Sequence, residues 1–148
     1  MRSLMACIIT YYCKSRDVRY KQGMHEILAP FILLRSPPLT AAELFQMLYA
    51  TIALYLTKVY AVDDEFVSLQ CAFRLFRILM LYHEPALCNL LDQYDVGPEL
   101  YAMQWFLTLF TRAAVTTGDL LRLWDFLFVH GDPVLVYFVA LAFLRSKR

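Results

Sequence analysis

The sequence has 148 residues, of which 60% are hydrophobic, 16% aromatic and 18% charged, and its formal net charge is +1. An average soluble domain carries about 25% charged residues, so this composition excludes a disordered or low-complexity chain, and the small net charge leaves no basic footprint for nucleic acid. The length corresponds to a single domain.

The mean hydropathy of +0.49 raises the question of a membrane protein. The uncharged runs at residues 44–57, 100–111 and 133–144 are all shorter than the roughly 18 to 20 residues that a membrane-spanning helix needs. The first residues also lack the basic region, apolar block and cleavage site of a signal peptide. We therefore expect a cytoplasmic chain without a transmembrane segment.

Apolar residues recur at steps of three and four along nearly the whole chain, and no segment alternates as a half-buried strand does. We therefore expect an all-α fold, a single domain of about seven or eight packed helices joined by short loops. The expected helices are residues 3–15, 23–35, 40–60, 65–82, 85–92, 98–112, 117–129 and 133–145.

Local signals support several of these boundaries. Thr40 and Glu43 have the spacing of a capping box, and Pro85, Pro98 and Pro133 each suit the first turn of a helix. The apolar stripe of the most regular helix consists of Phe66, Leu69, Phe73, Phe76 and Met80, preceded by the acidic residues Asp63, Asp64 and Glu65.

The last expected helix, at residues 133–145, has no polar face in its PVLVYFVALAFL segment, so we expect protein on all its sides. The first and last helices together predict exposed apolar patches on this chain, which flanking helices or a second copy would cover. The cysteines show no spacing typical of a zinc site. We expect free, buried thiols at Cys7, Cys13, Cys71 and Cys88.

A polar stretch, KSRDVRYKQG at residues 14–23, separates the first two apolar helices. It places Gln22 directly before Gly23 and the start of a helix, whose free N–H groups favour anions such as phosphate. Gly23 would allow the backbone or phosphate of a partner to approach closely. A glutamine carboxamide can accept from a water and donate to a phosphate oxygen at once, which suits the orientation of water in a GTPase. An exposed glutamine before a glycine is also common in ordinary loops.

No motif indicates enzyme chemistry within the chain itself. The glycines are too few and too far apart for a phosphate-binding loop. His25 and Glu26 begin like a zinc-protease motif, but Ala29 stands where the second histidine would be. His83 and His130 fall at expected helix ends, where cap or surface roles are common. We therefore expect no metal site and no cofactor of its own.

The YKQGM segment at residues 20–24 resembles the Y-x-Q-G-M signature of the TBC domain, the helical module of Rab GTPase-activating proteins. The resemblance continues through HEILAPF at residues 25–31, PELYAMQWF at residues 98–106 and LRLWD at residues 121–125, in the family's order. It implies a TBC-type helical fold over residues 1–148. It also implies a regulatory protein that binds a Rab GTPase and stimulates GTP hydrolysis, and not an enzyme in its own right.

The resemblance assigns a catalytic role to Gln22, as a glutamine finger that enters the Rab active site. GTP and magnesium would belong to the Rab partner. The residues with implied Rab-binding or supporting roles are Arg16, Arg19, Tyr20, Lys21, Gly23 and Met24. The structural motif residues are Trp105, Arg122, Trp124 and Asp125.

The residue types suggest where these side chains lie. Large aromatics at helical spacing favour core positions for both tryptophans. Arg122 and Asp125 suit a buried or half-buried polar contact. We expect Tyr20 and Met24 to pack beneath the loop and hold Gln22 in place, whereas the basic side chains either solvate the loop or meet an acidic partner.

The family mechanism also uses an arginine from an I-x-x-D-x-x-R motif, which nothing here matches, since Arg2 lacks the preceding Ile and Asp. The resemblance therefore implies a partial TBC domain without the N-terminal segment that would bring the arginine finger. An arginine finger is worth about 10³ to 10⁵ in rate, so residues 1–148 alone should activate weakly or not at all. Arg19 also departs from the glycine common at this position in active members.

Further segments, at residues 73–77, 82–88 and 131–138, look like the TBC branch that also carries rhodanese-like and PH-like domains and tethers endosome-derived vesicles at the trans-Golgi. Members of that branch can lack the catalytic fingers. The alternative function is therefore a non-catalytic module that binds a golgin or another tethering protein. Both functions belong to vesicle trafficking, in the cytoplasm at Golgi or endosomal membranes, and the sequence does not indicate which Rab is bound.

Overall fold

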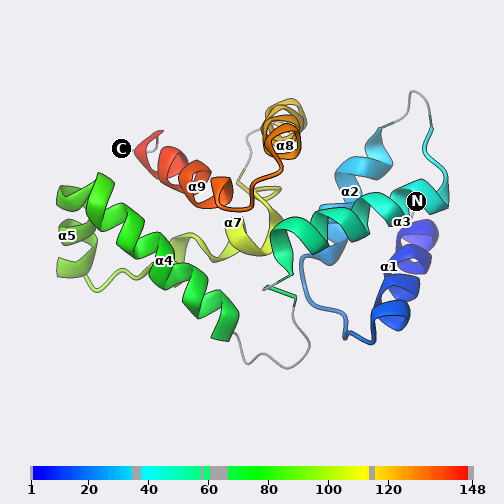
Figure 1. Ribbon diagram of the computed structural model, residues 1–148, viewed down its shortest axis with the longest axis horizontal. Helices are drawn as coiled ribbons and strands as arrows, with labels where there is room; N and C mark the ends of the chain where they lie inside the picture. Colours follow the sequence, from blue (N-terminus) through cyan, green and yellow to red (C-terminus); the bar gives the residue numbers. More distant parts are fainter. Residues whose placement is uncertain (1, 35–37, 58, 61–66, 114–115, 147–148) are drawn as a thin grey trace.

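The computed structural model describes residues 2–34, 38–57, 59–60, 67–113 and 116–146. The elements in this part of the chain are helices, which confirms the all-α fold (Figure 1). In chain order they are α1 (Arg2–Arg16), α2 (Met24–Leu33), α3 (Ala41–Thr51), a π-helical turn η1 (Ile52–Leu56), α4 (Val67–His83), α5 (Pro85–Gln93), α6 (Pro98–Tyr101), α7 (Met103–Thr108), α8 (Thr117–His130) and α9 (Leu135–Ser146).

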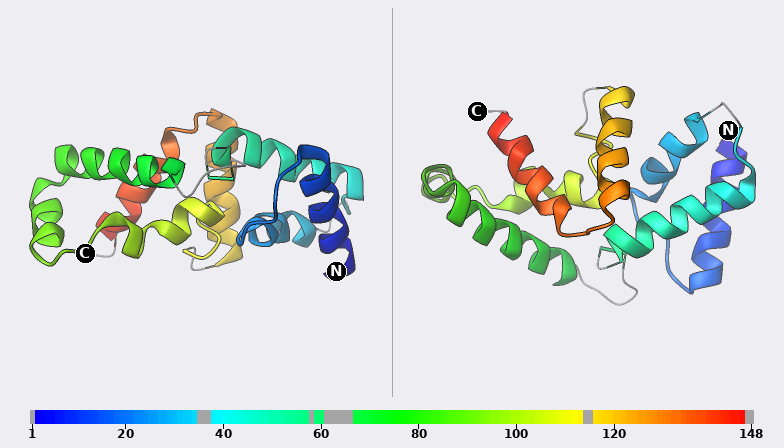
Figure 2. Two further views of the ribbon diagram at one scale, coloured as in Figure 1. Left: turned by 90° about the horizontal axis from the view of Figure 1, so that it is seen from below. Right: turned by 45° about the horizontal axis from the view of Figure 1, so that its top comes forward.

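The helices form an elongated body with two ends. Helices α1, α2 and α3 pack together at one end, and α4 and α5 form the other, with α6 to α9 between them (Figures 1 and 2). Helix α4 also contacts α6 and α9, and α2 contacts α7. Segments far apart in the sequence therefore meet in the middle of the molecule.

Caps explain where several helices begin and end. The Thr40 hydroxyl accepts from the Glu43 N–H, and the Glu43 carboxylate accepts from the Thr40 N–H at 2.7 Å, so the expected capping box is confirmed. Backbone and side-chain hydrogen bonds from Thr40 hold the pKa of Glu43 below its usual value. Pro85 and Pro98 lie in first turns as expected, whereas α9 begins two residues after Pro133.

One continuous apolar core runs through the molecule. The α4 stripe of Leu69, Phe73, Phe76 and Met80 is buried, as its spacing predicts, while Phe66 and the acidic residues 63–65 lie outside the described residues. Trp124 of α8 is 1% exposed, and its indole N–H donates to the Leu109 carbonyl at 2.8 Å.

The helix expected at residues 98–112 is instead two short helices, α6 and α7, followed by a turn. Leu109 and Phe110 end α7 in the left-handed conformation, with φ of 47° and 66°, and both are fully buried. The break contains no glycine, and the apolar residues keep their helical spacing through it, so the sequence pattern gives no sign of the break. The burial of both side chains and the indole bond to Leu109 offset a backbone strain of about 1 to 2 kcal/mol per residue.

Two expectations about burial are wrong. Cys88 is buried, but Cys13 is only half-buried and Cys7 and Cys71 are exposed, although all four are free. Helix α9 buries one face and leaves Phe138 41% exposed, because no described element covers its other side. On the first and last helices, where apolar patches are predicted, the large exposed side chains include Leu4, Tyr11 and Phe138, and a continuous patch there stays a prediction. None of the helices in the described residues has the length and apolarity to cross a membrane.

Candidate functional site around Gln22

The loop that carries Gln22 begins where α1 ends. Asp17 adopts a left-handed conformation with φ of 51°, and the Val18 N–H donates to the Cys13 carbonyl at 3.0 Å. This six-residue closure is the usual way to finish a helix, with aspartate in the place of the more common glycine. It fixes the N-terminal side of the loop to α1.

Gly23 fixes the other side of the loop, at the N-cap of α2. Its φ of 109° is open to glycine and strained for other residues, and a Cβ here would lie 2.7 Å from the Tyr60 hydroxyl and 3.2 Å from the Leu107 carbonyl oxygen. Gly23 is buried against its own chain, so the expectation that it admits a partner's backbone or phosphate is wrong. Met24, the next residue, is fully buried beneath the loop, as expected.

Tyr60 supports the loop from below. Its hydroxyl donates to the Leu107 carbonyl at 2.7 Å, and its side chain is 4% exposed. Burial raises its pKa strongly, and the nearby charge of Glu26 acts in the same direction. The phenol therefore remains a neutral hydrogen-bond donor to α7, and Gly23 packs against its hydroxyl.

A charged pair joins the start of α2 to the turn that follows α7. The Arg112 guanidinium donates from Nε and Nη2 to both Glu26 oxygens, at 2.5 Å each, across 86 residues of sequence. The Glu26 side chain is 15% exposed and the Arg112 side chain 40%. Such a two-point contact fixes direction as well as distance. Glu26 and Arg112 thus brace the N-terminus of α2, two residues after Gln22.

Gln22 itself is exposed, and within the described residues its carboxamide makes no hydrogen bond. Tyr20, two residues earlier, is 53% exposed and does not pack beneath the loop as expected. Its hydroxyl is instead hydrogen-bonded to His25 Nδ1 at 2.7 Å. The structure thus presents one free amide side chain on a loop that is bound on both sides.

The basic residues of the loop have different surroundings. The Arg16 guanidinium lies 5.3 Å from the ring centroid of Tyr49 on α3, in a cation–π contact. Arg19 is exposed, whereas Lys21 is half-buried and has an interaction of its own. A cavity of about 450 Å³ lies beside the loop. Its lining includes Arg2, Met5, Ile9, Lys14, Tyr20 and His25.

Comparison with known proteins gives the chain a family, because residues 1–148 match the family model described as the Rab-GTPase-TBC domain. The chain belongs to this TBC family. It is 33% identical over 147 residues to human TBC1 domain family member 1, which covers 99% of this chain and 12% of that protein. It is 30% identical over 132 residues to the chicken TBC domain-containing protein kinase-like protein, covering 89% of this chain and 14% of the relative. The chain thus spans about an eighth of the length of these relatives.

The TBC motif residues on α8 divide between its two faces. Leu120, Trp124 and Leu127 are buried, whereas Arg122 and Asp125 are exposed and, in the described part of the chain, form no hydrogen bond or ion pair. The expected buried polar contact is therefore wrong. Steps of four and three residues direct the apolar side chains to one face, and positions 122 and 125 fall on the opposite face.

Trp105, the other motif tryptophan, is half-buried and packs against Phe110 and Phe143, with ring centroids 6.3 Å and 5.7 Å away. Its core position is confirmed in part. Together with Trp124, it holds the left-handed turn at Leu109 and Phe110 from two sides. These residues of the TBC motif stabilise the turn that brings Arg112 to Glu26.

Sequence reasoning did not identify Tyr60, Glu26 or Arg112 as part of the site. Glu26 carries the one local signal, an acidic side chain in the first turn of a helix. Arg112 lies in what the periodicity predicts as a continuous helix, and its contact depends on the turn at residues 109–110. Thr111, within this turn, has a buried hydroxyl oxygen without a partner in the described part of the chain.

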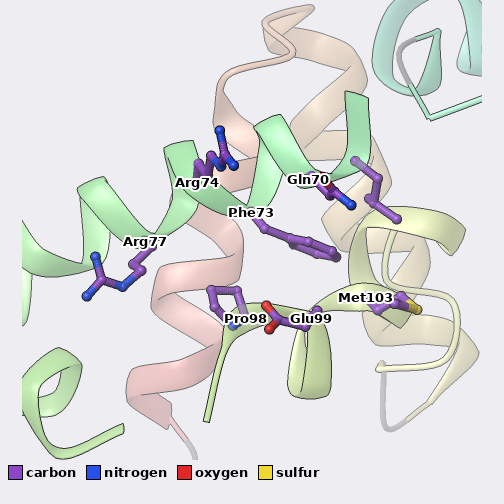
Figure 3. A pocket seen from close by; sticks show the side chains of 8 residues that line it. Gln70, Phe73, Arg74, Arg77, Pro98, Glu99 and Met103 are labelled. Atoms are coloured by element: carbon purple, nitrogen blue, oxygen red, sulfur yellow. The ribbon is translucent and has the colours of Figure 1, made fainter. Parts of the chain in front are cut away.

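A second hollow, of about 500 Å³, lies far from Gln22 between α4 and the segment of α6 and α7 (Figure 3). The Phe73 ring extends from α4 toward Pro98 and Met103 in this groove (Figure 3). Arg77 is held by Asp92 at 2.6 Å, whereas Arg74 is exposed and forms no ion pair among the described residues. No metal-binding cluster is found in the described parts of the chain.

Proposed function

We propose that this TBC domain binds a GTP-loaded Rab GTPase and stimulates hydrolysis by inserting Gln22 into the Rab active site. The observation that carries the proposal is the exposed carboxamide of Gln22, which makes no hydrogen bond to the described residues, on a loop anchored at α1 and at buried Gly23. Membership of the Rab-GTPase-TBC family supports a GTPase-activating function of this kind. The protein would act in vesicle trafficking, in the cytoplasm at Golgi or endosomal membranes.

The chemistry of Gln22 follows from its two polar atoms. The carboxamide oxygen accepts a hydrogen bond from the attacking water, and the NH₂ group donates to an oxygen of the γ-phosphate. The Rab supplies the nucleotide and its magnesium, so the TBC domain needs no cofactor. The exposed guanidinium of Arg19 lies on the same loop and can meet an acidic partner surface.

Residues 1–148 supply no candidate for the arginine finger of the family mechanism. An arginine finger contributes about 10³ to 10⁵ in rate. We therefore expect these residues on their own to accelerate hydrolysis weakly, and the test requires the full-length protein.

The test is single-turnover GTP hydrolysis by a panel of purified Rab proteins, with full-length protein and its Gln22→Ala variant. Loss of a group that positions the reacting atoms lowers such rates by about 10²-fold. Gln93→Ala is the matched control, because Gln93 is an exposed glutamine at the end of α5. Equal acceleration by the wild-type protein and Gln22→Ala, with every Rab that responds, would contradict the proposal.

The groove of Figure 3 supports a second candidate, a non-catalytic module that binds a golgin or another tethering protein. Its apolar floor suits a side chain of a partner peptide, and the exposed guanidinium of Arg74 at its rim, which forms no ion pair with the described residues, suits a neighbouring carboxylate. This function does not use Gln22. Under it, Gln22→Ala would leave partner binding unchanged, and no Rab would respond to the wild-type protein.

A further inference from the structure

Tyr20 and His25 stand on either side of Gln22 in sequence, and their side chains are joined by a hydrogen bond. We propose that this pair is a clamp that fixes the direction of Gln22, and that Tyr20 and His25 are positioning residues for the reaction. The inference rests on the proposed function of Gln22, since it concerns what holds that side chain in place.

The geometry closes a short segment of chain. The Tyr20 hydroxyl lies 2.7 Å from His25 Nδ1, across five residues, and Gln22 lies within the closed segment. Nδ1 accepts this bond when the imidazole proton is on Nε2, and Nε2 faces Glu26 Oε1 at 3.6 Å. A carboxylate on that side favours the tautomer that the clamp requires.

The His25 end of the clamp stands on a fixed base. Glu26 is bound at two points by Arg112, and Gly23 is enclosed by Tyr60 and Leu107. The first turn of α2 therefore has little freedom to move relative to the end of α7. Tyr20 lies on the other side of Gln22 in sequence, so the bond between Tyr20 and His25 joins the two ends of the segment that contains Gln22.

The clamp affects the direction of the Gln22 side chain more than the stability of the fold. Tyr20 is 53% exposed and the His25 side chain 42% exposed, so water competes for their hydrogen bond and its contribution to global folding is small. A displacement of about 1 Å in a catalytic group can nevertheless cost about 10²-fold in rate. A loss of rate at unchanged stability thus distinguishes a positioning role from a merely structural one.

Limited proteolysis can test the clamp, because the loop contains three trypsin sites, after Arg16, Arg19 and Lys21. Limited trypsin digestion of the native full-length protein, with the fragments identified by mass spectrometry, measures how often the loop opens. We expect Tyr20→Phe and His25→Ala each to raise cleavage after Arg19 about fivefold, the effect of losing one hydrogen bond. The double variant should be no faster than either single variant, because both substitutions remove the same bond.

Two further variants separate the clamp from a general loss of structure. His25→Asn keeps an acceptor near the position of Nδ1 and should restore wild-type cleavage. Tyr94→Phe, at a tyrosine that is 74% exposed at the end of α5, is the matched control and should change nothing. The melting temperature should stay the same as in the wild-type protein in the four clamp variants, which are Tyr20→Phe, His25→Ala, their combination and His25→Asn. The rate of Rab-bound GTP hydrolysis should fall about fivefold in Tyr20→Phe and His25→Ala with little change in KM.

Unchanged cleavage in both single variants, or additive effects in the double variant, would overturn the clamp whatever the role of Gln22. The proposed function is decided separately by Gln22→Ala, which leaves the bond between Tyr20 and His25 intact. If Gln22→Ala hydrolyses GTP like the wild-type protein while the clamp variants are cleaved faster, the clamp holds the loop and the glutamine-finger proposal fails.

Discussion

The loop around Gln22 and the groove between α4 and α6–α7 are both exposed to solvent, but they are built differently. The loop is held by a buried glycine, a buried phenol and a two-point ion pair that joins residues 86 apart in sequence. The ion pair beside the groove, Arg77 with Asp92, is also a two-point contact, but it joins residues only 15 apart and its side chains are 45% and 40% exposed. A side chain that must be aimed needs fixed surroundings, whereas a binding groove needs only shape and charge.

The largest expected effect comes from breaking the enclosure of Gly23. In Gly23→Ala, the methyl group meets the Tyr60 hydroxyl and the Leu107 carbonyl oxygen at a φ of 109°. We expect the free energy of unfolding to fall by about 3 kcal/mol, from backbone strain and overpacking together. Urea unfolding followed by tryptophan fluorescence measures this change.

Gly131→Ala is the matched control for this comparison. Gly131 also has a left-handed φ, of 63°, but beyond its own neighbours in the chain no described residue has an atom within 4 Å of its added Cβ. We expect a loss of about 1 kcal/mol from strain alone. Equal losses in the two variants would mean that the contacts with Tyr60 and Leu107 do not constrain the loop.

The helices could be predicted from the sequence to within a few residues, because apolar spacing and caps are local properties. Thr40 with Glu43 and the buried stripe of α4 are examples. The break at Leu109 and Phe110 could not, since both residues fit the apolar helical pattern and neither is a glycine. Packing of Trp124 and Trp105 against the turn selects a conformation that local preferences oppose.

In the candidate site, too, one part could be predicted from the sequence and the other could not. Gln22 was identified through the resemblance of residues 20–24 to the TBC signature, and its exposed position agrees with that role. Its supports, Tyr60, Glu26 and Arg112, come from distant parts of the chain, and no spacing rule connects them with residues 17–23. They become visible only when the fold brings α7 to α2.

Alkaline pH should distinguish the Gln22 loop from the groove, because each of these regions contains a tyrosine with a raised pKa. Burial raises the pKa of Tyr60 beneath the loop strongly, and burial raises that of Tyr101 near the groove to about 12. An unfolded tyrosine ionises near pH 10, so both contributions to stability are complete below pH 10 and are lost as the pH rises through the folded-state values. We expect the free energy of unfolding to fall from pH 10 upward.

The two tyrosines should contribute unequally to this fall. Each phenol can contribute up to about 1.4 kcal/mol per pH unit between pH 10 and its folded-state pKa, and that interval is wider for the more deeply buried Tyr60 than for Tyr101. The free energy of unfolding, measured in urea between pH 8 and pH 12, should therefore fall with similar slopes in Tyr60→Phe and Tyr101→Phe just above pH 10, and less steeply in Tyr60→Phe near pH 12. The opposite order would mean that the phenol beneath the loop is open to solvent.

The smallest changes in stability should come from breaking the two ion pairs, one beside the Gln22 loop and one beside the groove. Arg112→Ala removes the brace from Glu26, a carboxylate that is only 15% exposed and would lose both of its hydrogen bonds. Arg77→Ala breaks an exposed pair that contributes little. We expect a lower urea midpoint for Arg112→Ala and an almost unchanged one for Arg77→Ala.

Because high salt screens exposed charges more than partly buried ones, 1 M NaCl should reduce this difference between the two variants only in part. Complete loss of the difference in salt would show that the pair at the start of α2 acts as a surface contact, and that the loop around Gln22 does not depend on it.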